Sequence, residues 1–181
     1  MLGIFAIIAV AFIAFLIWGY NRGVSLRNYV EEAFSTMDVY LKKRWDLLPN
    51  LIEVVKAYTQ HEKNLLTELT EIRTRDYQNM SVAEKIDTNK AVGKVLPKIT
   101  AVAENYPDLK ANQSYCLLMQ QMNGIEDDIA NARKYYNGTV RELNTYLDVF
   151  PTNLIGSFFN IKREKMFEID NSERQNIKAD L

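Results

Sequence analysis

The N-terminal residues constrain the fold most, because they form an apolar stretch that water-soluble domains rarely expose. Residues 2–18 read LGIFAIIAVAFIAFLIW, 17 residues without a charged side chain, and Gly19 and Tyr20 extend the stretch. About 19 helical residues span roughly 28 Å, close to the hydrocarbon thickness of a bilayer. We therefore expect residues 1–23 to form a transmembrane anchor. Its lipid-facing residues are predicted to include Leu2, Ile8, Phe12, Leu16 and Trp18.

A cleaved signal peptide is the alternative interpretation of this stretch. It would need a basic start, a shorter apolar core and a cleavage site with small residues. None of these features precedes Arg22, so we favour an uncleaved, single-pass anchor. The nearby basic residues, beginning with Arg22 and Arg27, follow the stretch. The positive-inside rule then predicts an N-terminus outside the cell and a cytoplasmic C-terminal domain. The single cysteine, Cys116, agrees with a reducing compartment.

The rest of the chain has the spacing of amphipathic helices. It contains few helix breakers, with 7 Gly and 4 Pro in the whole sequence. Apolar residues recur at alternating steps of three and four, which is typical of a bundle. Ser81 and Glu84 form the S-x-x-E pattern of a capping box at one helix start. The sequence predicts an all-α fold: the transmembrane helix, an up-and-down antiparallel four-helix bundle over 24–150, and a C-terminal tail over 151–181.

Pro49 leaves two interpretations of the first cytoplasmic segment. The apolar positions stay nearly in register across it, which favours one kinked helix. However, a proline inside a helix costs about 3 kcal/mol, and one helix over 24–75 would be about 78 Å long, more than the later helices could cover. We therefore expect a break at 46–49, with Asp46 capping the second helix and the basic residues 42–44 ending the first. Four alternating helices would then bring the tail back to the membrane side.

Several sequence blocks in this order point to a known family. They are LRNYVEEAF (26–34), LKKRWDLLPNLIEVVKAYTQHEK (41–63), AVAENYPDLKAN (101–112), YYNGTVRELNTYLDVFPTNLIG (135–156) and FE (167–168). Together they resemble the LemA family of bacterial membrane proteins with one N-terminal span, which includes proteins associated with magnetosome membranes. The resemblance implies a four-helix cytoplasmic bundle with a turn at Pro49, and residues that serve as structural markers rather than catalytic groups. These residues are Arg44, Asp46, Pro49, Asn50, Tyr106, Pro107, Asp108, Asn137, Phe150, Pro151 and Asn153.

The residues needed for metal or cofactor chemistry are scarce. A di-iron bundle needs two Glu-x-x-His pairs, but His61 is the only histidine and Tyr58 stands three residues before it. His61 and Cys116 supply too few ligands for a structural zinc site, and haem at His61 would lack an attachment motif. A complete phosphate-binding loop is also missing. We expect no enzyme and no cofactor. Because 22 basic residues balance 23 acidic ones, we expect no nucleic-acid partner either.

The tail mixes apolar and basic residues, and two interpretations stay open. It can fold back over the end of the bundle, or it can form an amphipathic segment against anionic lipid or a partner. The candidate contacts are Phe158, Phe159, Lys162, Arg163 and Lys165. We expect a non-enzymatic scaffold or adaptor at the inner membrane face, which interacts with the lipid bilayer and an unidentified protein. Homo-oligomerisation stays open. The alternative is a membrane-shaping protein whose tail engages anionic lipid.

Overall fold

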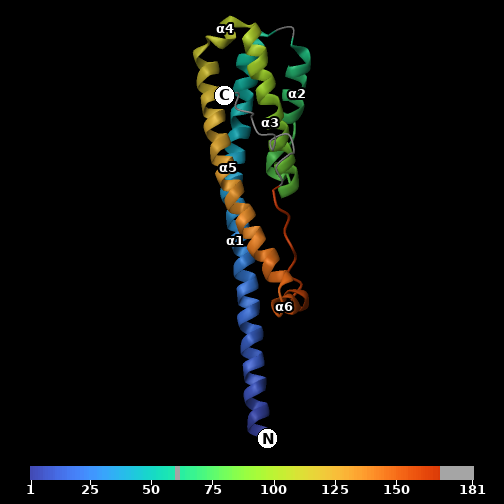
Figure 1. The fold of residues 1–181 in the computed structure, drawn as a ribbon. Coiled ribbons are helices and arrows are strands. Elements are labelled where there is room, and N and C mark those ends of the chain that lie inside the picture. Colours follow the sequence, from blue (N-terminus) through green and yellow to red (C-terminus); the bar gives the residue numbers. More distant parts are fainter. Residues whose placement is uncertain (60–61, 168–181) are drawn as a thin grey trace, which may run out of the picture. The chain divides into compact units, whose positions relative to one another are not determined.

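The computed structural model describes residues 1–59 and 62–167, and all regular elements in this part of the chain are helical. The elements are α1 (Leu2–Tyr58), α2 (Lys63–Arg73), the 3₁₀ turn η1 (Tyr77–Asn79), α3 (Val82–Asn105), α4 (Pro107–Lys110), α5 (Gln113–Asp148) and α6 (Thr152–Phe158) (Figure 1). The expected all-α fold with a long apolar N-terminal helix is confirmed. The chain divides into two compact units, residues 1–35 with 132–181, and residues 36–131, and both α1 and α5 contribute to each.

The unit over 36–131 is a bundle of antiparallel neighbours. In this unit the second part of α1 meets the first part of α5, where the Arg44 guanidinium lies 2.6 Å from the Glu126 carboxylate. The short helix α2 returns beside α3, and Lys98 bonds Glu68 across them at 2.7 Å. The core of this unit is aliphatic, as its fully buried side chains show: Met37, Leu48, Leu51, Val55, Leu69, Ile99, Leu109, Met122 and Ile129. These four helices form the expected bundle, but their boundaries differ from the prediction.

The predicted break at 46–49 is wrong. Helix α1 runs without interruption for 57 residues and contains Pro49 in its interior. Asp46 therefore caps no helix and instead pairs with Lys42 one turn earlier on the surface. The basic residues 42–44 do not end a helix either, because Arg44 is only 2% exposed and lies in the core. The turn at Pro49 implied by the family resemblance is overturned by the same observation.

Burial explains why the helix continues. On either side of Pro49, Trp45 is 3% exposed and Leu48 and Leu51 are fully buried. Each fully buried aliphatic side chain contributes about 1.5–3 kcal/mol. Together these residues offset the roughly 3 kcal/mol cost of a proline in a helix interior. A break at Pro49 would have turned this apolar seam away from its partners.

The chain reverses about a dozen residues later than predicted. Helix α1 ends at Tyr58 and α2 begins at Lys63. Thr59 ends α1 by donating both its backbone N–H and its hydroxyl to the Val55 carbonyl, at 3.0 and 2.8 Å. The chain still reverses between α1 and α2, so successive helices of the bundle still alternate in direction as predicted. The length argument failed because no single neighbour has to cover all of α1: α2 and α3 pack only in the unit over 36–131.

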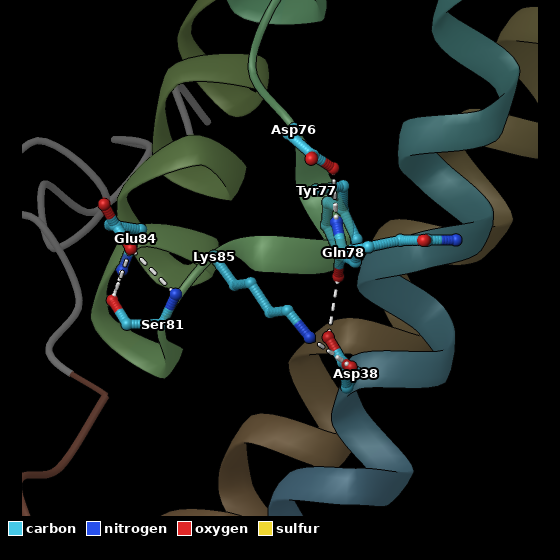
Figure 2. A network of polar contacts seen from close by, with 7 residues as sticks. All are labelled: Asp38, Asp76, Tyr77, Gln78, Ser81, Glu84 and Lys85. Atoms are coloured by element: carbon cyan, nitrogen blue, oxygen red, sulfur yellow. Dashed lines mark hydrogen bonds and ion pairs between the residues drawn. The ribbon is translucent and has the colours of Figure 1, made fainter.

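A polar network fixes the connection between α2 and α3. Asp38 on α1 accepts hydrogen bonds from the Tyr77 hydroxyl in η1 and from the Lys85 ammonium in α3, both at 2.7 Å (Figure 2). The predicted capping box at the start of α3 is confirmed, since Ser81 and Glu84 exchange bonds through backbone and side chain. These bonds hold the pKa of the Glu84 carboxyl below its usual range. The network therefore ties three elements to one carboxylate.

In the unit formed by residues 1–35 and 132–167, α1 and α5 also run antiparallel. Phe34 packs edge-on against Tyr136, with ring centroids 6.0 Å apart, while the Tyr146 hydroxyl reaches the Gly19 carbonyl at 2.6 Å. Helix α5 ends at Asp148. The marker residue Phe150 lies beyond the helix and is 74% exposed. The chain then turns into α6 beside α1.

Candidate membrane-interface site

The first part of α1 has no protein packed around it. Residues 1–14 are all exposed, and only 6% of the most apolar 18-residue stretch of α1 is buried. In the described part of the chain, α1 is the one helix whose length and composition allow it to cross a membrane. Of the predicted anchor residues, Leu16 is half-buried, and the others are exposed: Leu2, Ile8, Phe12 and Trp18. This arrangement is consistent with a single-pass membrane protein.

Two glycines on α1 let the rest of this unit approach closely just after the apolar stretch. A β-carbon at Gly19 would overlap the end of the Ile155 side chain and lie 3.4 Å from the Tyr146 hydroxyl oxygen. A β-carbon at Gly23 would collide with Ile161 and lie 3.2 Å from the Tyr146 ring. Both glycines are buried. The short helix α6 therefore docks on α1 at Gly19, and the chain that follows α6 docks at Gly23, at the level where the uncharged segment ends.

The outer face of α6 is apolar and uncovered. Phe158 is 80% exposed and Leu154 is 61% exposed, and Phe150 precedes the helix with 74% exposure. Phe159, at the end of α6, stacks on Tyr20 of α1 with centroids 4.7 Å apart. The helix itself, TNLIGSF, carries no charge. The site thus has an inner face anchored on α1 and an outer face of large apolar side chains.

The chain after α6 runs back along α5 as an extended segment, residues 161–167, which we call the strap. Its last residue, Phe167, is buried with 2% exposure, and its ring lies under the Arg133 guanidinium at 4.4 Å. Residues 162–166 are exposed. Among the predicted basic contacts, Arg163 pairs with Asp148 of α5, while Lys162 and Lys165 extend from the strap surface. The strap therefore folds back on the protein, and α6 is an uncharged helix with an apolar outer face.

The structure separates the predicted contact residues into two groups. Phe158 and Phe159 belong to the end of α6, and the basic residues belong to the strap. The aromatic pair is in mutual contact, with ring centroids 5.0 Å apart. The site is therefore more apolar than the tail sequence suggested.

The marker residue Arg44 forms a different cluster, inside the unit over 36–131. Its Nη1 donates to Asn89 Oδ1 at 2.8 Å and also pairs with Glu126. The cavity that Arg44 lines with Trp45 and Tyr77 has a volume of about 10 Å³, far below the roughly 300 Å³ of a ligand pocket. Burial and the bond to a carboxylate raise the pKa of the Tyr77 hydroxyl. The cluster therefore acts as a polar clamp between helices.

The other marker residues lie at helix surfaces and helix ends. Asn50 is exposed on α1. Tyr106 ends α3 and precedes α4, with its hydroxyl 3.4 Å from Glu62, and Pro107 and Asp108 form the first turn of α4. Asn137 bonds the strap, half-buried Pro151 precedes α6, and half-buried Asn153 lies in the first turn of α6.

Of the two residues considered as metal ligands, Cys116 is the one that the described part of the chain includes. His61 lies outside the described residues. Cys116, near the start of α5, is exposed, and its sulfur lies 3.3 Å from the Lys110 carbonyl oxygen. Within residues 1–59 and 62–167, no group of three or more His, Cys, Asp or Glu side chains is arranged to hold a metal ion.

Sequence reasoning missed the residues that assemble the site. Gly19 and Gly23 were treated only as part of the span, although their four-residue spacing places both on one helix face. That spacing of small residues is a known signal for close helix contact. Tyr146 and Asn144 gave no such signal, because polar residues near a helix end are usually solvated. Their role depends on where the tail returns, which periodicity does not determine.

Comparison with known proteins agrees with this architecture. The model of the LemA family matches residues 33–180. The chain is 23% identical to magnetosome protein MamQ 2 of Paramagnetospirillum magneticum over 185 residues, which cover 88% of this chain and 68% of the relative. It is 22% identical to protein LemA of Metamycoplasma hominis over 153 residues, which cover 83% of this chain and 69% of the relative. Because the family model matches most of its length, the chain belongs to the LemA family.

Proposed function

We propose that this chain is a non-enzymatic scaffold or adaptor that stands on the membrane through two contacts, the span of α1 and the interfacial helix α6. The observation that carries this proposal is the docking of α6 on Gly19, directly after the uncharged stretch, with the residue that begins the strap, Ile161, against Gly23. If residues 2–18 occupy the hydrocarbon core, α6 lies at its edge, with Phe158 turned outward. The candidate membrane span of α1 and the magnetosome name of one relative agree with a role at a membrane.

The energetics favour lipid as the cover for the outer face of α6. Large apolar side chains gain about 1.5–3 kcal/mol each when they leave water completely. Three of them, Phe150, Leu154 and Phe158, are more than 60% exposed in the protein alone. Trp18 and Tyr20 on α1 add aromatic rings at the same level, as expected of residues at a bilayer interface. A short uncharged helix held at this level would fix how the single span is oriented relative to the membrane surface.

The proposed orientation has the N-terminus outside and the bundle in the cytoplasm, because basic residues follow the span. Cys116 provides a direct test, since it is exposed and is the only cysteine in the sequence. An impermeant maleimide should leave Cys116 unlabelled in intact cells and label it after permeabilisation. Labelling in intact cells would refute the cytoplasmic orientation.

The scaffold role itself requires a protein partner. In-cell photocrosslinking from exposed positions on the bundle, followed by mass spectrometry, should give one reproducible partner. Position 50 on α1 suits the crosslinker because Asn50 is exposed. A matched crosslinker at Leu48, which is fully buried, is the control for non-specific products. Products that are the same for both positions, or that vary between preparations, would contradict an adaptor role.

A membrane-shaping protein is the second candidate, and the uncovered apolar face of α6 is the observation that favours it. An amphipathic element inserted at the headgroup level expands one leaflet and favours curvature. Full-length protein reconstituted in anionic vesicles should then reduce vesicle diameter relative to a Leu154→Glu, Phe158→Glu variant. Charge reversal of Lys162 and Lys165 tests the anionic lipid contribution, with reversal of Lys134 on α5 as the matched control. Equal diameters for wild type and the α6 variant would exclude membrane shaping by α6 without excluding the adaptor role.

A further inference from the structure

The strap is held in the manner of a bound peptide. One strap side chain pairs with α5, through Arg163 and Asp148. The other five hydrogen bonds between the strap and α5 all end on strap backbone atoms. Asn144 donates to the Glu164 carbonyl at 2.9 Å and accepts from the Glu164 N–H at 3.1 Å. Asn137 does the same with Phe167, at 2.9 and 2.7 Å. The Tyr136 hydroxyl donates to the carbonyl between them.

The spacing of the two asparagines matches an extended chain. Asn137 and Asn144 are seven residues apart, so they lie on one face of α5, about 10.5 Å apart along the axis. Their strap partners, residues 164 and 167, are three residues apart, which is about 10 Å in an extended backbone. The two asparagines are therefore spaced so that each can bond the backbone of one residue of an extended segment. Such a ladder recognises backbone and tolerates different side chains.

Selectivity comes from the ends of the strap. Phe167 is buried under Arg133, and Ile161 packs against Gly23. The five side chains between them are exposed. The site thus fits an extended segment with an aliphatic residue at one end and an aromatic residue six positions later. Most of the recognition is independent of the intervening sequence.

We infer that α5 carries a peptide-binding site, made by Asn137, Asn144 and Tyr136, that takes residues 161–167 either from its own chain or from a second copy. Every copy carries a matching segment, and an exchanged strap makes the same contacts as a strap bound within one chain, so exchange loses no contact energy. Copies anchored by α1 share one plane and one orientation, which raises the effective concentration of the second strap. The inference goes beyond the adaptor role and does not depend on a protein partner.

A complementation experiment tests this inference with full-length chains. One variant, Asn137→Leu with Asn144→Leu, loses the site but keeps the strap. The other, Phe167→Ala, keeps the site but loses the anchor of its own strap, which should weaken strap binding roughly 100-fold. Co-reconstituted and differently tagged, the two variants should associate, because the strap of the first can occupy the site of the second.

Matched mixtures separate strap exchange from general association. Each variant mixed with itself should associate at least about tenfold less than the complementary pair, since one required half is then missing from every chain. Adding Phe167→Ala to the site variant should abolish association with its partner. Complementary pairs that associate no better than the self-mixtures would overturn the inference.

Hydrogen exchange in the unmodified chain provides a test that does not depend on the variants folding. If the strap is an exchangeable ligand, the Glu164 and Phe167 amides should exchange through local opening, while the α5 amides beneath them stay protected. If these strap amides exchange only as slowly as the most protected α5 amides, the strap is a permanent part of the core and the inference is wrong.

Discussion

Replacing Pro49 by alanine tests the continuous helix most sharply among stability measurements. Because α1 passes through Pro49, the Pro49→Ala variant regains an amide that can bond the Trp45 carbonyl one turn earlier. A proline inside a helix is about 3 kcal/mol less favourable than alanine. The variant should therefore be more stable than the wild type.

Two opposing effects reduce this gain. Alanine allows the unfolded chain more conformations, which costs about 0.4–1 kcal/mol. Pro49 is also half-buried, and removing its ring loses about 1 kcal/mol of apolar burial at about 0.8 kcal/mol per methylene. The net stabilisation is about 1 kcal/mol. In a chain of this size that raises the Tm by about 2–4 °C.

Thermal unfolding of the full chain in detergent micelles gives the measurement, with the fluorescence of buried Trp45 as the signal. Pro107→Ala is the matched control, because Pro107 stands at the first turn of α4, where proline costs nothing. The control should be neutral or slightly destabilised. If Pro49→Ala behaves like Pro107→Ala, the chain turns at Pro49 and the continuous helix is refuted.

Other predictions follow from the packing and the polar network. Gly23→Val should push against Ile161 and the Tyr146 ring, cost about 1–3 kcal/mol, and increase hydrogen exchange at the start of the strap; unchanged exchange there would contradict the close packing on Gly23. Glu126→Ala should lower the denaturation midpoint more than Arg44→Met does. Glu126→Ala leaves a guanidinium buried without this carboxylate, whereas Arg44→Met leaves a carboxylate on a side chain that is 42% exposed and hydrates readily. The reverse order of midpoints would contradict the clamp. The pKa of Tyr77 is raised, so its contribution to stability is present below its usual pKa of about 10 and is lost as the pH rises above that value. In alkaline denaturation, a Tyr77→Phe variant should therefore lose less stability above pH 10 than the wild type does.

The sequence predicted the helical class, the apolar N-terminal helix and the capping box at Ser81, because each depends on local spacing or composition. Periodicity also identified the seam that continues across Pro49. The error came from giving more weight to the local cost of proline than to the burial of Trp45, Leu48 and Leu51. Local cost and tertiary burial are similar in size here, so the sequence alone could not decide between them.

The site was predicted only in part. The tail was identified as the segment of interest, and Phe158 is indeed highly exposed. The docking of α6 on Gly19 was not predicted, because it depends on contacts between residues more than 100 positions apart. The role of Asn137 and Asn144 also escaped, since a side chain that bonds a distant backbone carries no periodic signal in its own helix.

The depth of residue 158 in a bilayer tests the central claim most directly. A nitroxide on Phe158→Cys, in a Cys116→Ser background, can be compared in vesicles with one on Lys134→Cys, an exposed site on α5. If α6 lies in the interface, the label at 158 collides mainly with lipid-soluble oxygen, and the label at 134 collides mainly with a water-soluble nickel chelate. Equal access of the nickel chelate to both labels would contradict the placement of α6 in the membrane interface.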